Sequence, residues 1–495
     1  MSETIVAQVG AGPRAGDREW VTPGEPASRR VLAVVAGSAL AVAVLVPVQK
    51  VGVGWTAAGV VMAAAVVLLA RPELRPSAEP RGPGRPRTAP DPLYIGLAVA
   101  LASAGAIRAA EWLFVLCALA SVGCLSLALS PGRSAWALAF GSVSAWIAGF
   151  LALPWLFEGS KTLRRERGGA RIGWSVAVGT GLLLVFGALF ASADAAFARL
   201  VESLTPQASE VDGTGVVVFG VAALFVGGVA HLVAAPMPEP DGRRRRGPVR
   251  LIEWALPVGV LLGLFVVFIG VQVAVLFGGD TYVSSAGMTY AGYARSGFWQ
   301  LLVVTGLVLA VIAVAARVAP VGTGAERAWL RVLLGGLTAA TLVVVVSAIS
   351  RLWLYQQTYG FTVLRLLVGV AEVWLGLVCL MVLAAGRSLR AAWLPKAVLT
   401  SALAALLGLV VLNPERFVAE WNVDRYAGTG RIDTGYLGRL SADAVPALAA
   451  LPEPVRACVL ANHKITKDRP LEWNWGRSQA AGHLAAVGHC ADAHG

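Results

Sequence analysis

Long apolar runs, separated by short polar joints, follow one another along most of this chain. Because main-chain N–H and C=O groups in lipid must be paired within the element, runs of this length and of Leu/Val/Ala composition predict transmembrane α-helices. We place candidate spans at 31–48, 53–70, 93–107, 112–130, 135–157, 173–193, 214–235, 254–277, 298–319, 329–349, 363–385 and 395–412. The predicted fold is therefore all-α, a polytopic transmembrane helix bundle of about 11–12 spans with a small extracytoplasmic helical C-terminal domain.

The polar stretches divide the chain into segments. Residues 1–30 predict a disordered cytoplasmic tail without a cleavable signal peptide, and the Pro/Arg-rich residues 71–92 predict a cytoplasmic linker. The other predicted segments are two transmembrane helices in 31–70, two or three in 93–157, a seven-helix core in 173–412, and the helical domain in 413–495.

Composition supports a membrane protein. The chain is 57% hydrophobic and 14% charged, whereas soluble domains carry about 25% charged residues. The formal net charge of +12 lies mostly in arginine-rich joints beside apolar runs, which is typical of the positive-inside bias. We therefore expect the lipid bilayer as the main partner and no nucleic-acid partner, because no basic, aromatic-rich soluble domain is present.

The basic joints give one orientation. The joints rich in Lys and Arg are 158–171, 236–250, 317–331 and 386–396, and they alternate with the Lys/Arg-poor joints 194–213, 278–297 and 350–362. The basic joints should be cytoplasmic, where their arginines can contact anionic lipid head groups. This predicts a multi-pass protein of the cell membrane with a cytoplasmic N-terminus and an extracytoplasmic C-terminal domain.

One part of the pattern conflicts with this rule. The linker 71–92 and the joint 158–171 are both basic, which requires an even number of crossings between them. Three apolar runs lie there, at 93–107, 112–130 and 135–157. Either one of the three is re-entrant or lies in the interface, or the rule is broken once. This parity favours eleven spans over twelve.

The five cysteines fall into two groups. Cys117, Cys124 and Cys379 lie in apolar spans, where cysteine packs as a small hydrophobic residue. Cys458 and Cys490 lie in the C-terminal domain, on the predicted oxidising side of the membrane. We predict a disulfide between Cys458 and Cys490.

The best candidate for a site is a polar vestibule on the side of the C-terminal domain. Glu372 lies near the middle of its predicted span, and Arg365 lies about 10 Å nearer the outer end on the same face. An unpaired carboxylate at this depth should take up a proton or bind a cation. The adjoining joints supply the remaining candidates, which are Tyr290, Tyr293, Arg295, Arg351, Tyr355, Gln356 and Tyr359. Alternatively, these tyrosines are interfacial anchors and the arginines snorkel towards head groups.

Signatures of catalysis are scarce. The chain lacks a GxxxxGK[ST] loop, an HExxH helix, a GxSxG elbow and a CxxC pair. Although His483, Cys490 and His494 would share a helix face, chain ends fray and Cys490 has a disulfide partner at hand. We expect no catalytic residue, metal or cofactor.

These observations favour transport, envelope sensing or scaffolding over an enzyme. The alternative is a membrane-embedded enzyme that acts on a lipid-linked or anionic lipid substrate. The first outer loop, "VQKVGVG" (48–54), counts against a lipid-linked sugar transferase because it carries Lys50 and no carboxylate.

Four stretches carry a resemblance to a known family. They are "SADAAFARLV" (192–201), "TYAGYARSGFWQLL" (289–302), "SRLWLYQQTYGFTVLRL" (350–366) and "LNPERFVAEWNVDRYAGTGRIDTGYLGRLSADAVPAL" (412–448). In these stretches, from about residue 180 to 450, the chain resembles the bacterial multi-pass membrane proteins known as domain of unknown function 4173, with its relative 4153. The resemblance implies a membrane protein of a type common in actinobacteria, and it carries no activity and no functional residue.

Overall fold

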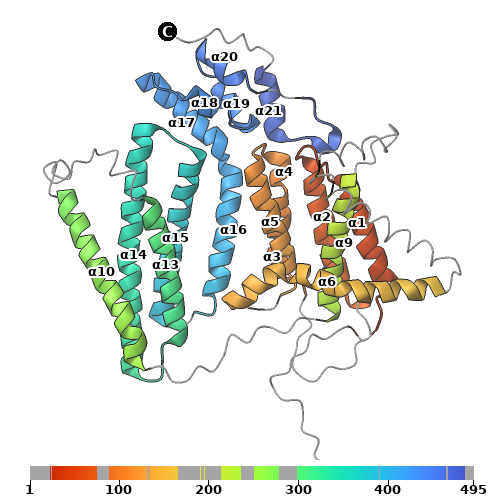
Figure 1. The fold of residues 1–495 in the computed structure, drawn as a ribbon, viewed down its shortest axis with the longest axis horizontal. Coiled ribbons are helices and arrows are strands. Elements are labelled where there is room, and N and C mark those ends of the chain that lie inside the picture. The colour runs from red at the N-terminus through yellow and green to blue at the C-terminus, as the bar shows by residue number, and fades with distance from the viewer. Residues whose placement is uncertain are drawn as a thin grey trace, which may run out of the picture.

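The computed structural model describes residues 25–74, 89–130, 134–165, 213–235, 250–277, 298–389, 391–463 and 466–484, together with the single residues 23, 132, 190 and 194. All elements in these ranges are helices, as predicted. The helices of the bundle are α1 (Arg29–Leu45), α2 (Val53–Leu69), α3 (Pro92–Ala102), α4 (Ala104–Ile107), α5 (Glu111–Leu127), α6 (Ala135–Arg165), α9 (Gly213–Ala234), α10 (Leu251–Phe277), α13 (Phe298–Val318), α14 (Gly324–Tyr359), α15 (Val363–Ser388) and α16 (Leu394–Leu412). Figure 1 shows most of them side by side in one broad layer.

The apolar helices make this a multi-pass membrane protein. Seven described helices are long and apolar enough to cross a membrane, namely α6, α9, α10, α13, α14, α15 and α16. Shorter apolar helices form from Val53–Leu69, Pro92–Ile107 and Glu111–Leu127, and the second of these is broken at Ser103 into α3 and α4. The predicted span at 173–193 lies outside the described residues, so the total of eleven or twelve spans stays a prediction.

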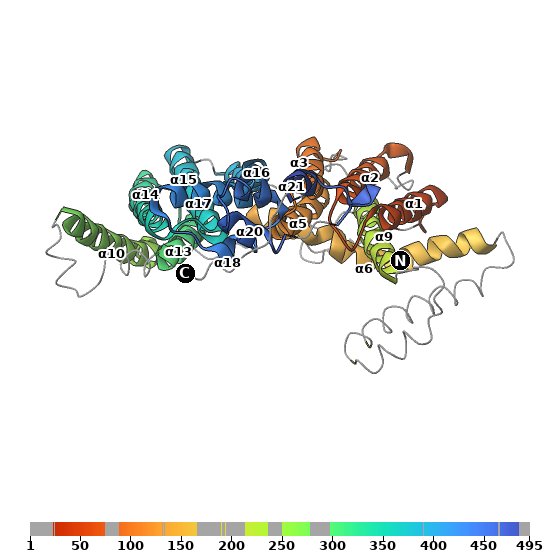
Figure 2. The same cartoon turned by 90° about the horizontal axis from the view of Figure 1, so that it is seen from above.

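Helix α6 covers the predicted span 135–157 and is long and apolar enough to cross a membrane, but its direction differs from that of its neighbours. In Figure 1 it lies across its neighbouring helices, near their ends opposite the C-terminal domain, and Figure 2 shows it extending sideways from them. Small residues permit this crossing, because Gly149 lies against the backbone of Leu224 and Gly228 lies against the backbone of Ala145. If only α3–α4 and α5 cross between the linker and the joint 158–171, the number of crossings is even, as the basic joints require; this count stays a prediction.

Two hydrophobic cores meet at α15, whose Leu367 and Val370 pack against one core and whose Val382 packs against the other. One core involves α1 to α6, α9 and α16, and the other involves α10, α13 and α14. Helix α16 packs against α15 on one side and against α3, α5 and α6 on the other. Polar contacts hold both of its ends, since Lys396 forms an ion pair with Asp91 at 2.7 Å and Arg108 Nε donates to Val410 O at 2.6 Å.

The described basic joints gather at one end of the bundle. The α1–α2 loop contacts the C-terminal domain, and each later helix along the bundle reverses direction. The helix ends that carry Arg29, Arg250, Arg317, Arg327, Arg387 and Lys396 therefore lie opposite the C-terminal domain. Assigning this end to the cytoplasm stays a prediction.

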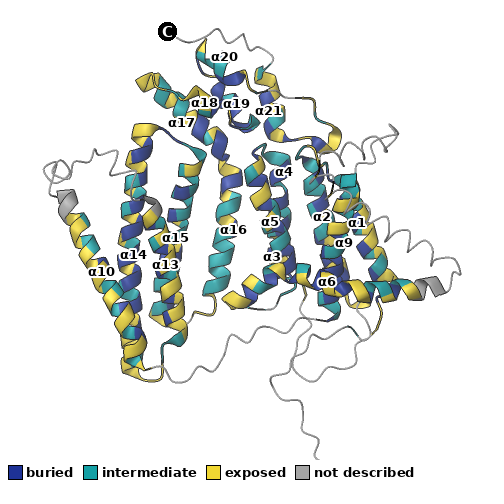
Figure 3. Ribbon diagram, in the orientation of Figure 1, coloured by how far each residue is buried: buried dark blue, intermediate teal, exposed yellow. Residues whose placement is uncertain are grey.

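The C-terminal domain covers the other end of the bundle. Its elements are α17 (Pro414–Thr429), α18 (Thr434–Leu437), η2 (Ala442–Ala444), α19 (Val445–Leu448), α20 (Val455–Leu460), η3 (Pro470–Glu472) and α21 (Trp475–Leu484). It has a core of its own, with Val418, Leu437, Leu448 and Leu460 buried (Figure 3). Phe361, from the α14–α15 turn, belongs to the same core, so domain and bundle share packing there.

Helix α14 is longer than predicted, and this changes the candidate site. The predicted span 329–349 and joint 350–362 become one helix that continues to Tyr359. It ends where Gly360 takes a positive φ of 80° and donates its N–H to Gln356 O, a backbone conformation that favours glycine. Thr362 then caps α15 by accepting from Arg365 N.

Candidate functional site

The candidate site is a pocket where the end of α14 meets α17. Its volume is about 350 Å³, and it is lined by Gln356, Gln357, Phe361, Trp421, Asp424 and Arg425. Ligand pockets of small molecules begin at about 300 Å³. The pocket therefore has room for a small ligand at the junction between bundle and domain.

Aromatic rings form one wall of this pocket. Phe361 and Trp421 stack with centroids 4.7 Å apart and an interplanar angle of 28°. Trp353 meets Trp421 edge-on at 5.9 Å, and Phe417 lies 6.2 Å from Phe361. Such rings are rigid and offer a flat, partly apolar surface to a ligand.

Polar groups form the remainder of the lining. The Gln356 side chain is buried, with the residue only 6% exposed, and its amide has no hydrogen-bond partner among the residues that the structure describes. Asp424 is exposed, and within the same described ranges its carboxylate forms no ion pair. The Gln356 amide atoms are not among the fully buried polar atoms without a partner, so a polar ligand or water in the pocket can hydrogen-bond to them.

Helix α17 is fixed above the α14–α15 turn by its own polar side chains. Asn422 Nδ2 donates to Phe361 O at 2.9 Å, and Arg425 Nη2 donates to Thr358 O at 2.8 Å. From α18, the Tyr436 hydroxyl accepts from Val363 N at 2.8 Å, and burial raises the pKa of this tyrosine. The pocket is therefore held between two elements that are hydrogen-bonded to each other.

The described residues of the predicted vestibule do not line one common site. Arg365 Nη1 donates to Gly360 O at 2.6 Å, and its guanidinium lies 4.4 Å from the centre of the Tyr355 ring. The Tyr359 ring is 4.8 Å from that of Tyr355. These three side chains thus support the turn beside the pocket, and among the described residues of the predicted set only Gln356 lines the pocket itself.

Other predicted residues lie away from the pocket. Arg351 Nη2 donates to Gln272 Oε1 of α10 at 2.5 Å. Tyr290, Tyr293 and Arg295 lie outside the described residues, so their part in a vestibule stays a prediction.

Glu372 lies in the contact between α15 and α14. It is 1% exposed, and neither carboxylate oxygen has a hydrogen-bond partner in the described part of the chain. One turn to either side, a Cβ on Gly369 would lie 3.4 Å from Leu352, and one on Gly376 would lie 3.4 Å from Val345. Neither cavity described in this section is lined by Glu372.

Sequence reasoning missed most of the pocket. Trp421, Asp424 and Arg425 lie at i, i+3 and i+4 of α17, and these spacings share one helix face. The stretch "EWNVDRY" (420–426) could have indicated this face, but nothing local relates it to Gln356 of α14.

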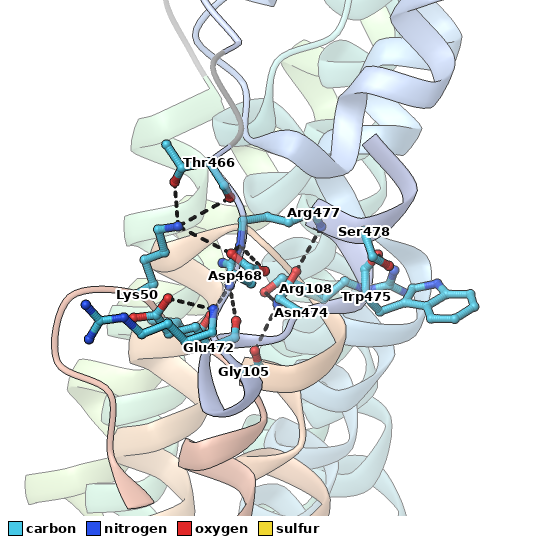
Figure 4. A network of polar contacts seen from close by, with 12 residues as sticks. Lys50, Gly105, Arg108, Thr466, Asp468, Glu472, Asn474, Trp475, Arg477 and Ser478 are labelled. Carbon is cyan, nitrogen blue, oxygen red and sulfur yellow. Dashed lines mark hydrogen bonds and ion pairs between the residues drawn. The ribbon is translucent and has the colours of Figure 1, made fainter. Parts of the chain in front are cut away.

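A second contact joins the C-terminal domain to the α1–α2 loop (Figure 4). Lys50 Nζ donates to Thr466 Oγ1 at 2.5 Å and lies 3.4 Å from Asp468 Oδ1. Arg477 Nε lies 3.0 Å from Asp468 Oδ2, and its Nη2 donates to Val51 O at 2.8 Å. The first loop, which lacks a carboxylate of its own, thus has Asp468 beside it, held by two cations.

Asp443 makes a third contact, at the start of α5. It is 2% exposed, and its Oδ2 accepts from Ala109 N at 2.7 Å and from Ala110 N at 3.1 Å. Burial raises the pKa of this carboxyl to about 6 in spite of these hydrogen bonds and the nearby Arg108. A cavity of about 20 Å³ beside Asp443 and Arg108 holds roughly one water molecule.

The described residues include only some of the cysteines and histidines considered in the sequence for a disulfide or a metal site. Cys117, Cys124 and Cys379 are free and buried, whereas Cys458 is disulfide-bonded. The predicted partner, Cys490, lies outside the described residues, so this pairing stays a prediction. Over the described ranges there is no group of three or more His, Cys, Asp or Glu residues that could hold a metal ion.

Comparison with known proteins identifies a family. No curated protein matches the chain, and no solved structure matches it. The model of the family described as Domain of unknown function (DUF4153) matches residues 96–451. The match falls on DUF4153, the relative of family 4173, and it begins well before residue 180, so it includes most of α3 and all of α4 to α6. The pocket and Asp443 lie inside the matched region, whereas Lys50 and Asp468 lie outside it. The chain belongs to the DUF4153 family of domains of unknown function.

Proposed function

We propose that this membrane protein is a receptor that binds a small polar ligand in the pocket between α14 and α17. The observation that carries the proposal is Gln356, which is only 6% exposed as a residue and lines an aromatic-walled pocket without a hydrogen-bond partner among the described residues. Polar groups of this kind, placed on an apolar wall, are typical of small-molecule sites.

The lining favours a carbohydrate as the ligand class. Asp424 and Arg425 both line the pocket, so their charges offset each other and the site has no strong preference for an ion. Carboxylate and amide oxygens accept hydrogen bonds, while amide and guanidinium groups donate them, which suits hydroxyl groups that do both. The ring of Trp421, which is 38% exposed and stacked on the buried Phe361, can offer an electron-rich face to the C–H groups of a sugar ring.

The position of the pocket favours sensing over transport. A ligand there would contact both the end of α14 and the face of α17, and α14 continues for 36 residues to the opposite end of the bundle. A ligand can shift a conformational equilibrium only through different contacts in the two states. A pocket shared by two elements supplies that difference, whereas Glu372 and Arg365 line neither cavity.

The orientation is part of this proposal. We place the C-terminal domain outside the cell membrane and the N-terminus in the cytoplasm, because basic residues lie at helix ends opposite the domain. An actinobacterial source and kinship with the family 4173 are likewise proposals, which rest on the four sequence stretches.

The test measures binding to the full chain in lipid nanodiscs. Isothermal titration with glucose, N-acetylglucosamine and a disaccharide should detect binding, while tetramethylammonium and free amino acids should give none. Trp421→Ala and Gln356→Ala should weaken saccharide binding about tenfold or more, the equivalent of about 1.4 kcal/mol.

Trp329→Ala is the matched control, because Trp329 is an exposed tryptophan near the other end of α14. It should bind saccharides like the unaltered protein. Absence of saccharide binding, or equal binding by Trp421→Ala, would overturn the proposal. Binding of tetramethylammonium alone would overturn the carbohydrate class and leave the pocket in place.

A further inference from the structure

One half of the bundle is shorter than a bilayer. Helices α1, α2 and α5 each have 17 residues. At 1.5 Å per residue each spans about 25 Å, whereas the hydrocarbon core of a bilayer is about 30 Å thick. Helix α9, with 22 residues, reaches about 33 Å. The short helices therefore do not reach across the full hydrocarbon core of a bilayer by themselves.

The segment 471–475 of the C-terminal domain lies directly on the start of α2 and beside the end of α4. Trp473 O accepts from Val53 N, the first residue of α2, at 2.9 Å. Gly52 and Gly54 allow this approach, since a Cβ on Gly52 would meet the backbone of Glu472 and one on Gly54 would lie 3.2 Å from Leu471 O. The segment is thus hydrogen-bonded to the start of α2 and packed closely against it.

The side chains of this segment divide by polarity. Leu471, Trp473 and Trp475 are 37%, 43% and 50% exposed. Asn474 points inwards, donating to Gly105 O at 2.9 Å and to Arg108 O at 2.8 Å. Figure 4 shows the Trp475 ring pointing away from the network around Asp468 and Arg477. The outward face is therefore apolar and aromatic.

The apolar face continues onto a neighbouring helix. The rings of Trp473 and Trp475 are 6.3 Å apart, and Trp475 shares a small cavity with Asn413, which follows α16. Val411, at the end of α16, is 80% exposed. A surface that joins the ends of two apolar helices through two exposed tryptophans has the composition of a membrane-interface belt.

We infer that the 471–475 segment is immersed in the bilayer interface on the side of the C-terminal domain. Leu471, Trp473 and Trp475 contact lipid there and complete the apolar height that α1, α2 and α5 lack. The partner is the lipid surface itself, because the segment is continuous with membrane helices. The pocket between α14 and α17 plays no part in this inference.

Spin labelling in nanodiscs tests the immersion. A nitroxide label is attached to a single cysteine in each of two variants, Trp473→Cys and Trp475→Cys. The matched control is Ala461→Cys, at an exposed residue just after α20. Labels at 473 and 475 should be more accessible to oxygen than to a water-soluble nickel complex, and the label at 461 should show the reverse. Nickel access at 473 and 475 equal to that at 461 would overturn the inference. Labels shielded from both reagents would also overturn it, by showing that protein covers this face.

Bilayer thickness supplies a second, independent test. For each protein, the melting temperature is measured in nanodiscs of increasing lipid acyl-chain length. The chain length that gives the highest melting temperature should be shorter for the double variant Trp473→Ser/Trp475→Ser than for the unaltered protein, because the apolar height of the variant is reduced. Trp329→Ser is the control and should keep the original chain-length optimum. An unchanged optimum in the folded double variant would contradict the inference.

Discussion

Asp443 Oδ2 accepts a 2.7 Å hydrogen bond from the backbone N–H of Ala109, just before α5 begins. The first turn of α5 has no side-chain cap from its own N-cap residue, Ala110, and Asp443 also accepts from the N–H of Ala110. A carboxylate is the preferred partner of a helix N-terminus, because free N–H groups and the positive end of the helix dipole meet there. The C-terminal domain therefore supplies a cap to a helix of the bundle.

We predict that this contact makes stability depend on pH. Burial raises the pKa of Asp443 from the ordinary value of 3.8 to about 6, so the folded protein binds this proton more tightly than the unfolded chain. This contribution is complete below about pH 4 and is lost as pH rises through about 6. The protein should be more stable at about pH 5 than at about pH 7.5, by about 1 kcal/mol from this group.

Melting temperatures in nanodiscs at the two pH values measure the effect. Asp443→Asn keeps an acceptor for Ala109 and Ala110 but carries no charge, so it should reduce the pH difference and melt higher than the unaltered protein at about pH 7.5. Glu420→Gln, an exposed change on α17, should leave the pH difference intact. A larger pH difference in Asp443→Asn would refute the role assigned to burial.

The cap at α5 illustrates what sequence can and cannot predict. Apolar runs locate the helices, because the rule that pairs main-chain groups in lipid acts locally. Thr362 is likewise a local cap, three residues from its donor Arg365. Asp443 and Ala109 are 334 residues apart, and only the docking of the domain brings them together. Gln356, Trp421 and Asp424 form a pocket for the same reason.

Gly360→Ala should weaken the junction between α14 and the C-terminal domain. Gly360 has φ 80°, and a Cβ there would lie 2.7 Å from Asn422 Oδ1. We expect a loss of about 1–3 kcal/mol from backbone strain, with further loss from the displaced Asn422. Differential scanning calorimetry in nanodiscs should show a lower melting temperature. Gly408→Ala, in open space on α16, should be neutral or stabilising by up to about 1 kcal/mol, and equal effects of the two changes would contradict the prediction.

Glu372→Met should stabilise the bundle. The carboxylate is fully buried beside α14, with no hydrogen-bond partner among the described residues, and methionine has a similar shape without the polar atoms. Replacing buried charged groups by apolar ones of similar volume stabilises proteins by about 1–4 kcal/mol. Thermal unfolding of the purified variant measures the change. A lower melting temperature would show instead that Glu372 holds a partner, as the transport hypothesis requires, and Val378→Met controls for added bulk on the same helix.

Helix α6 should leave the chain on one side of the membrane. It is apolar enough to span, with Trp136 62% and Phe150 64% exposed, yet it lies across the helices that it contacts (Figure 2). Ala145 and Gly149 of α6 lie against the backbone of α9, and we expect the exposed apolar groups of α6 to contact lipid. Reporter enzymes fused after Gly132 and after Arg165, at either end of α6, should therefore give the same topological signal, shared with a fusion in the linker 71–92. A fusion after Arg108, where α4 meets α5, should give the opposite signal. Opposite signals from the fusions at 132 and 165 would mean that α6 crosses the bilayer, and the basic joints would then violate the positive-inside rule once.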